Sequence, residues 1–282
     1  VLAGSDPGVL TRDGEETEVL LDAEWAGALA PSTQVRVVIG TLAGDIPEAL
    51  VKAVADRSGD IISISFGLCE PQAPTVATEV FDGFYAIANA QGQTVLVSSG
   101  DDGAQDCAPS SDQVAVNALA ASPHAIAVGG TSLFVQFDAE GNVTHYIGET
   151  VWNDDHGAGG GGQSTVFARP RYQIPLGLGF RGRVLPDLAL AAAPGTVPVG
   201  DGTSTPTGVP GYVVVEGQRT RVVGGTSAST PALASILSLI GQRMGGGGLG
   251  QLLPSLYRLG NEQARGLRAP VFRDVTVGSN GF

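Results

Sequence analysis

The chain has 282 residues, 43% of them hydrophobic, which is enough to bury the core of one large α/β domain or two smaller ones. Its net charge of −13 argues against nucleic acid as a partner. No apolar run approaches the roughly 20 residues of a membrane-spanning helix, and the first ten residues do not have the pattern of a signal peptide. The chain starts with Val rather than Met, so we expect a processed or cut piece of a longer protein.

Apolar periodicity predicts alternating helices and strands along the first half of the chain. The expected order is helix 16–30, strand 34–40, helix 45–58 with Asp45 as N-cap, strand 60–67, helix 76–92, a strand from 94 that runs into a turn ending at 103, and strand 125–131. This alternation predicts a parallel sheet with right-handed crossovers.

The second half of the chain has a weaker pattern. Residues 131–222 contain short β-like runs and the glycine tract 157–164, and a long helix is expected over 231–244. We find no internal repeat and no linker that divides the chain, so we expect one domain spanning 1–282.

The segment "GGTSASTP", residues 224–231, stands between a short apolar run and the long helix. Ser227 is therefore expected where the helix begins, and there the helix dipole and the free N–H groups favour developing negative charge. A serine at this position can be a nucleophile. It, or its neighbour Thr226, can equally be an ordinary N-cap.

A serine nucleophile needs a base, and the three histidines are poor candidates. His124 is expected at the start of a strand, His145 in a hairpin and His156 on a glycine-rich loop. We therefore interpret all three as structural or solvated residues.

Carboxylates are the alternative bases. Glu18 and Asp22 are four residues apart on the first predicted helix, so their side chains share one face. Two like charges this close raise the pKa of one member, and such a pair can deprotonate a serine in acid. The alternative interpretation is a solvated acidic face. Glu15, Glu16 and Glu24 are competing acids, and Glu24 lies about 240° around the helix from Glu18.

A further acid follows a predicted strand in "VLVSSGDDG". A protonated Asp101 at this strand end can donate a hydrogen bond to a tetrahedral oxyanion. Its neighbour Asp102 competes for this role, and a plain turn aspartate is the alternative interpretation of both.

The two cysteines are expected to pair. Cys69 follows the strand at 60–67 and Cys107 follows the turn after the strand that starts at 94, so both loops leave one edge of the sheet if these strands are neighbours. A disulfide suits an exported protein. Two independent buried thiols are the alternative.

Taken together, "ExxxD" on a helix, "SSGDDG" after a strand and "GGTSASTP" before a helix resemble the sedolisin family of serine-carboxyl peptidases. Other stretches along nearly the whole chain share the family's texture, among them "ISISFG", "AVGGTSL" and "VFRDVTVGSNG". The resemblance implies a subtilisin-like α/β fold, with a parallel sheet flanked by helices. It also implies that Ser227 is the nucleophile, Glu18 its base, Asp22 the partner of Glu18 and Asp101 the oxyanion-hole acid.

The same resemblance implies activity in acid on peptide or protein substrates, secretion, and a precursor with an N-terminal prodomain. It implies a calcium ion bound by the Asp274 carboxylate and the Val275 carbonyl, with further ligands from a later loop. The chain departs from the family pattern in three places. The part before Glu18 is short, the later calcium loop is absent, and Phe66 replaces a frequent tryptophan near the substrate cleft. We therefore expect a catalytic domain truncated at both ends, weak or no calcium binding by this piece, and mobile residues after Asp274.

Two other functions remain open from the sequence. One is an inactive family member or fragment that acts as a binding or structural module, and the other is a subtilisin-type Ser-His-Asp peptidase. The sequence also leaves open whether the enzyme would cut chains internally or remove tripeptides.

Overall fold

The computed structural model describes residues 1–8, 14–41, 46–108, 112–195 and 207–281. The helices are α1 (Glu15–Ala28), α2 (Ile46–Ala55), α3 (Thr75–Ala90), α4 (Thr226–Arg243) and α5 (Leu253–Ala264), with short 3-10 helices η1 (Glu70–Gln72) and η2 (Arg171–Leu176). The strands are β1 (Ile61–Ile64), β2 (Thr94–Ser98), β3 (Ile126–Phe137), β4 (Val143–Val151), β5 (Asn153–Asp154), β6 (Gly157–Ala158), β7 (Gly162–Ala168), β8 (Gly182–Leu185), β9 (Leu188–Ala191), β10 (Thr207–Gly208), β11 (Tyr212–Glu216) and β12 (Arg219–Val223).

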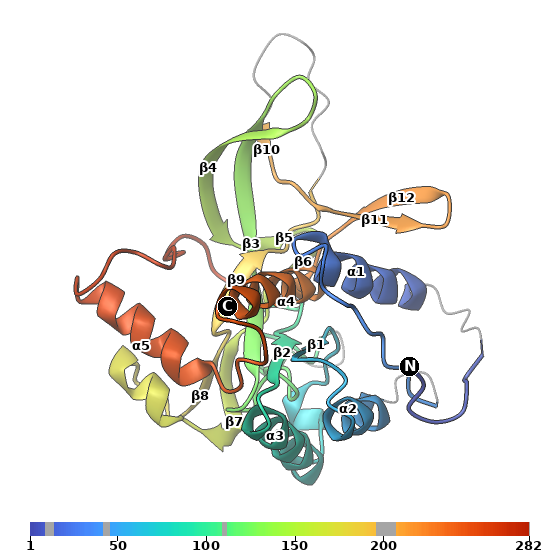
Figure 1. The fold of residues 1–282 in the computed structure, drawn as a ribbon. Coiled ribbons are helices and arrows are strands. Elements are labelled where there is room, and N and C mark those ends of the chain that lie inside the picture. The colour runs from blue at the N-terminus through green and yellow to red at the C-terminus, as the bar shows by residue number, and fades with distance from the viewer. Residues whose placement is uncertain (9–13, 42–45, 109–111, 196–206, 282) are drawn as a thin grey trace.

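A parallel sheet of β1, β2, β3 and β9 forms the centre of the molecule, as the alternation of elements predicts. The first part of β3 lies between β2 and β9. Its second part continues past the sheet and pairs with β4 and β10 in antiparallel fashion. In Figure 1 this extension rises above the helices, beside the separate hairpin of β11 and β12.

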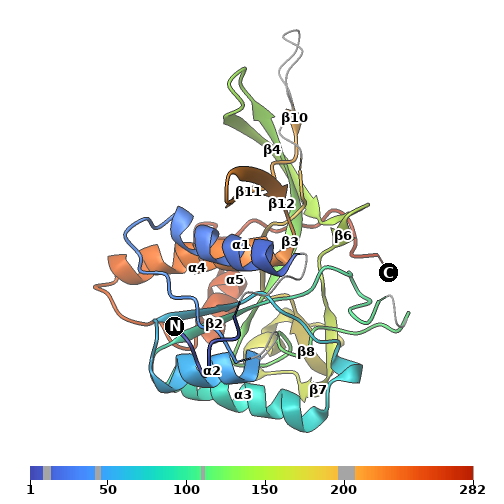
Figure 2. The ribbon, with the colours of Figure 1, turned by 90° about the vertical axis from the view of Figure 1, so that its right-hand side faces the viewer.

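Helices cover both faces of the parallel sheet. Val95 and Val97 of β2 pack with residues of α2 and α3 on one face. Leu96, between them, packs with residues of α4 and α5 on the other. Figure 2 shows this layering, with α2 and α3 on one side of β2 and α1 and α4 on the opposite side. All five residues of β2 are buried because apolar contacts cover both faces, which is typical of a central parallel strand.

The expected strand at 34–40 is not found. Only Ile39 in this segment makes a β-bridge, to Leu2, and the side chains of Val35 and Ile39 are exposed. A cavity of about 1080 Å³ is lined by this segment, by β1 and by parts of α1, α2 and α4. The segment is apolar enough for a strand. A strand also needs a neighbour to receive its backbone hydrogen bonds, and here the cavity separates it from β1.

Several other expectations need correction. Helix α4 begins at Thr226, five residues before the expected start, so Pro231 lies inside it. The stretch 131–222 does form short strands, as its β-like runs predict, whereas α5 is a helix that the sequence pattern does not predict. The residues after Asp274 are held in place rather than loose. Val151 N donates to Val277 O and Asn280 Nδ2 donates to Gly161 O. The expected N-cap Asp45 lies outside the described residues.

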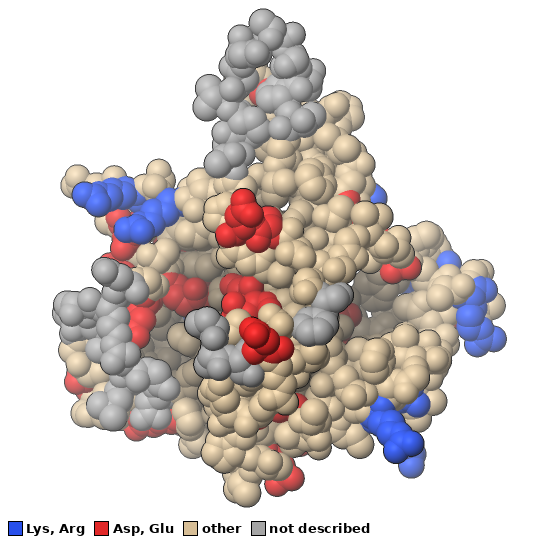
Figure 3. All heavy atoms as spheres, turned by 180° about the vertical axis from the view of Figure 1, so that it is seen from behind, with Lys and Arg blue, Asp and Glu red and all other residues tan. Residues whose placement is uncertain are grey.

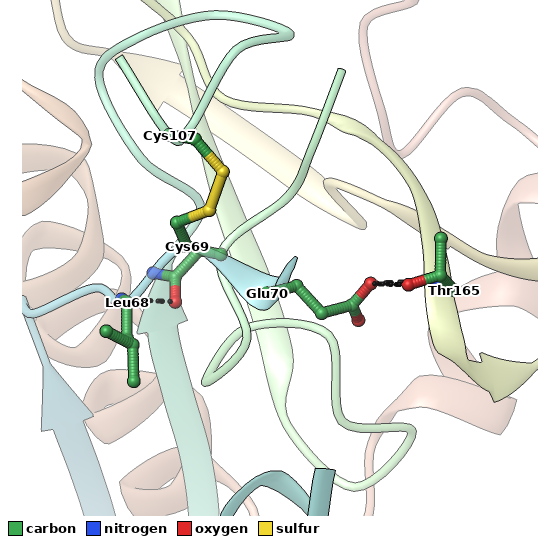
Figure 4. Close-up of a disulfide and its surroundings, with 6 residues drawn as sticks. Leu68, Cys69, Glu70, Cys107 and Thr165 are labelled. Carbon is green, nitrogen blue, oxygen red and sulfur yellow. Dashed lines mark hydrogen bonds between the residues drawn. A yellow bond between two sulfur atoms is a disulfide. The ribbon is translucent and has the colours of Figure 1, made fainter. Parts of the chain in front are cut away.

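The predicted disulfide between Cys69 and Cys107 is confirmed. It ties the segment after β1 to the loop after β2, beside the buried Glu70 (Figure 4). Glu70 accepts hydrogen bonds from Ser164 Oγ and from the backbone and hydroxyl of Thr165, so η1 is also fixed to β7. The two loops at the carboxyl ends of β1 and β2 are thereby held together.

Candidate active site

Four of the predicted site residues come from three elements that meet at the carboxyl end of the sheet. Glu18 and Asp22 are on α1, Ser227 is the second residue of α4, and Asp101 follows β2. Helix α1 packs along α4, so two segments that are far apart in the sequence lie side by side (Figures 1 and 2). The four residues are half-buried.

Ser227 and Glu18 are in contact. A hydrogen bond between their side chains stabilises the ionised Glu18 carboxylate, while burial and the charge of Asp101 act against it. Burial is the largest effect, and the net result raises the pKa of Glu18 to about 7. Its Oε1 is buried without a hydrogen-bond partner among the described residues. This carboxyl group is therefore poised to accept a proton.

Asp22 is the second carboxyl group of the pair. Burial and the charge of Glu18 raise its pKa, a hydrogen bond from Ser65 lowers it, and the net value is about 8. Both members thus hold protons more tightly than exposed acids do. Because the two groups interact, their protons leave in two steps that belong to the pair.

Asp101 is fixed against the start of α4. Its Oδ1 accepts hydrogen bonds from Thr226 N and Thr226 Oγ1, both at 2.8 Å. Burial raises the pKa of Asp101 and these two hydrogen bonds lower it. With Oδ1 engaged as an acceptor, a proton on Asp101 resides on Oδ2, where it can be donated to a bound group.

Other acids surround this cluster. Asp102 is mostly exposed. The limited burial of its carboxyl group and the charge of Asp101 raise its pKa. Burial and the charges of Asp102 and Asp101 raise the pKa of Asp106 to about 7. Figure 3 shows Asp and Glu side chains around a hollow in one face of the molecule. The Lys and Arg side chains on this face lie only at its outer edge. Sequence reasoning did not single out Asp106 or Ser65, because no local pattern marks them, and it considered Thr226 only as a possible N-cap.

The competing acids on α1 point elsewhere. Glu24 lies away from Glu18, as its position around the helix predicts. It accepts a hydrogen bond from Val215 N on β11. Glu16 is exposed.

The histidines have other contacts. His124 Nδ1 lies 2.8 Å from Asp82 Oδ1, and His156 Nδ1 lies 3.5 Å from Asp154 Oδ1. His145 is exposed on β4. Among the residues that the structure describes, no histidine is recorded in contact with Ser227.

The expected calcium ligands do not form a metal centre by themselves. Asp274 is exposed and Val275 is half-buried on an irregular segment. Within the described ranges, no three His, Cys, Asp or Glu residues are grouped so that they could hold a metal ion. Likewise, no helix in these ranges is long and apolar enough to cross a membrane.

The chain is similar to known serine peptidases. The subtilase family model matches residues 29–248. Kumamolisin from Bacillus sp. (strain MN-32) is 36% identical over 282 residues, covering 95% of this chain and 45% of that protein. Sedolisin from Pseudomonas sp. (strain 101) is 32% identical over 248 residues, covering 84% of this chain and 38% of that protein. The chain therefore spans less than half the length of these relatives.

A solved structure supports the same relationship. Pseudomonas sedolisin, a serine-carboxyl proteinase complexed with two molecules of pseudo-iodotyrostatin, matches with a TM-score of 0.80 and 28% identity, covering all of this chain and 75% of that one. The expected subtilisin-like α/β fold is thus confirmed. The chain belongs to the subtilase family, within its sedolisin group of serine-carboxyl peptidases.

Proposed function

We propose that the protein is an acid-acting serine-carboxyl peptidase that cleaves peptide bonds through an acyl-enzyme on Ser227. The observation that carries this proposal is the position of Ser227 beside Glu18, whose carboxyl group is buried and shares a face of α1 with Asp22. Glu18 takes the proton of Ser227 as the hydroxyl attacks the substrate carbonyl, and then gives it to the leaving amine. Asp22 is the second carboxyl group of the pair, and it orients Glu18.

The oxyanion of the tetrahedral intermediate forms near the start of α4. Protonated Asp101 donates one hydrogen bond to it from Oδ2. The first turn of α4 adds the positive end of its dipole and backbone N–H groups that have no partner inside the helix. The role of Asp101 requires its neutral form, which its raised pKa favours.

The pH dependence follows from these groups. The working state has one proton in the Glu18–Asp22 pair and one on Asp101. As pH rises, the pair and Asp101 lose these protons and activity falls, and burial, which raises the pKa of each group, moves this loss to a higher pH than exposed acids would show. As pH falls, the pair gains its second proton and the base is lost. A histidine base would instead lose activity in acid and keep it above neutrality.

The test is cleavage of a denatured protein substrate between pH 3 and 8, by this chain and by the longer protein that contains it. We expect a maximum below neutrality and a loss of about 10⁴-fold or more in Ser227→Ala. Ser238→Ala is the matched control, because Ser238 lies further along the same helix and its hydroxyl contacts Thr33. Replacing His124, His145 or His156 should leave the rate unchanged. Cleavage that survives in Ser227→Ala would overturn the proposal, and a chain that binds peptides without cleaving them would indicate a binding module.

The remaining features of the proposal concern the whole protein. We propose that it is secreted, is made with an N-terminal prodomain, and binds one calcium ion through Asp274, Val275 and ligands outside residues 1–282. The disulfide supports export, because such bonds persist in oxidising compartments. Calcium takes six to eight oxygen ligands, so two from this chain leave the site incomplete. Calorimetric titration should show tight binding of one ion only by the longer protein, and micromolar binding by this chain would show that the site is misplaced.

A further inference from the structure

Ser65 joins the two helices of the candidate site. It lies directly after β1 and is 6% exposed. Its Oγ donates a hydrogen bond to Asp22 Oδ1 at 2.5 Å and lies 3.3 Å from the backbone oxygen of Ser227. One hydroxyl group therefore contacts both the acid that accompanies Glu18 and the backbone of the proposed nucleophile.

A hydroxyl group has one proton to donate and lone pairs to accept another. When Asp22 is ionised, Ser65 donates to its Oδ1. When Asp22 carries a proton on Oδ1, it can donate that proton to Ser65 Oγ, and Ser65 can turn its own proton toward Ser227 O. Asp22 Oδ1 keeps a hydrogen-bond partner in both states, so Asp22 can change its protonation without losing this contact.

We propose that Ser65 is a positioning residue that orients Asp22 and sets how readily the Glu18–Asp22 pair gains and releases its proton. This inference rests on the proposed function of that pair. Ser65 itself touches Asp22 and the backbone of Ser227, and it acts on the reaction through them.

The surrounding charges set the background for this effect. Glu18 faces Asp22 from the same helix, and Asp101 from the loop after β2 acts on Glu18. From the β11–β12 hairpin, Arg221 lines a small cavity together with Glu18, and Arg221 is itself paired with Glu216. Glu24, the remaining acid of α1 near this hairpin, is bonded to Val215 N.

The sign of the effect follows from the hydrogen bond. Ser65 lowers the pKa of Asp22, against burial and the charge of Glu18. Removing the hydroxyl in Ser65→Ala should therefore raise the pKa of Asp22 further. The pair would gain its second, inactivating proton at a higher pH. We expect the acid limb of the pH–rate profile to move up by about one pH unit and kcat to fall about tenfold.

Ser63 supplies a matched control. It lies two residues earlier, in β1, and its buried hydroxyl has no hydrogen-bond partner among the described residues. Ser63→Ala removes the same atom next to the same sheet edge without touching Asp22, so its pH profile should match the wild type. Ser65→Thr keeps the hydroxyl and should have the wild-type pH profile. Valine has the shape of threonine without the hydroxyl, so Ser65→Val should behave as Ser65→Ala.

A second measurement does not need activity. The carboxyl ¹³C resonance of Asp22, titrated by NMR in the labelled 282-residue chain, should have a higher midpoint in Ser65→Ala than in the wild type or Ser63→Ala. Equal midpoints and equal acid limbs in the two alanine variants would overturn the inference. If the wild type cleaves nothing but the midpoint still moves, the proposed function fails while the coupling of Ser65 to Asp22 stands. If Ser65→Ala does not fold, the Ser65→Thr and Ser65→Val pair provides the same comparison.

Discussion

The two oxygens of Asp101 divide one observed role and one proposed role between them. Oδ1 accepts both hydrogen bonds from Thr226 and so holds the start of α4. Oδ2 is free to carry the proton that the proposed reaction needs. An asparagine can do both, because its carbonyl accepts and its amide donates without ionising.

We therefore expect Asp101→Asn to keep the fold and part of the activity, and to keep that activity to higher pH than the wild type. Asp101→Ala should lose both tasks. Without the two hydrogen bonds we expect a loss of about 1–3 kcal/mol in unfolding free energy, and without the oxyanion donor a loss of about 10²–10³-fold in kcat. Denaturant unfolding and pH–rate profiles of the two variants check this. Equal activity in Asn and Ala variants would remove Asp101 from the mechanism.

At the scale of single elements, the start of α4 depends on Gly225. Its φ of 104° is in the region that favours glycine, and a Cβ there would lie 2.6 Å from Asp101 Oδ2. The glycine thus allows both the turn into the helix and the close approach of the proposed oxyanion acid.

Gly225→Ala should therefore lower both stability and activity. Gly245, at the other end of α4, has the same φ of 104° with no atom within 4 Å of an added Cβ. Gly245→Ala should show only the backbone cost, about 1–3 kcal/mol, and keep its kcat. Thermal unfolding and peptide cleavage measured on both variants separate the two effects. A Gly225→Ala enzyme with unchanged kcat would show that Asp101 can move without consequence.

The disulfide acts on the loops that leave β1 and β2. It closes a loop with a sequence separation of 38 residues, and cross-links of this kind stabilise proteins by about 2–4 kcal/mol. The double variant Cys69→Ala/Cys107→Ala should lose stability of this order in denaturant unfolding. Reducing agent should lower the stability of the wild type to the same level and leave the double variant unchanged. A wild type that is insensitive to reductant after denaturation would argue against the bond.

For the whole molecule, the raised pKa values make stability depend on pH. The folded state holds a proton on the Glu18–Asp22 pair and one on Asp106 up to about pH 7 to 8, whereas the unfolded chain releases them near pH 4. Stability from these groups is complete below pH 4 and is lost as pH rises through 7 and 8. The net charge of −13 adds repulsion in the same direction.

We expect the melting temperature to fall by several degrees between pH 5 and pH 8. Asp22→Asn should flatten this dependence and be more stable than the wild type at pH 8, because an amide needs no proton to stay neutral. Glu16→Gln, at an exposed position of the same helix, should follow the wild-type curve. Scanning calorimetry of the three proteins across this range is the measurement. A wild type that becomes more stable toward pH 8 would contradict the burial of these acids.

The sequence by itself determined the parts of this protein that local pattern controls. Its apolar runs placed the buried strand β2 and most of α3, and the four-residue spacing placed Glu18 and Asp22 on one helix face. Its three short motifs, taken in chain order, were enough to indicate the family. These features depend on residues close together in the chain, so they can be recognised without a fold.

Only the tertiary structure decided what depends on distant partners. Ser65 and Asp22 are 43 residues apart, and Asp101 and Thr226 are 125 apart, so no local pattern shows that one hydrogen-bonds the other. The apolar segment 34–40 has the composition of a strand, yet it is not one here because no strand of the described ranges pairs with it along its length. A strand, a shared proton and a raised pKa each need a second group brought close by folding, and that group is set by packing rather than by the residues nearby.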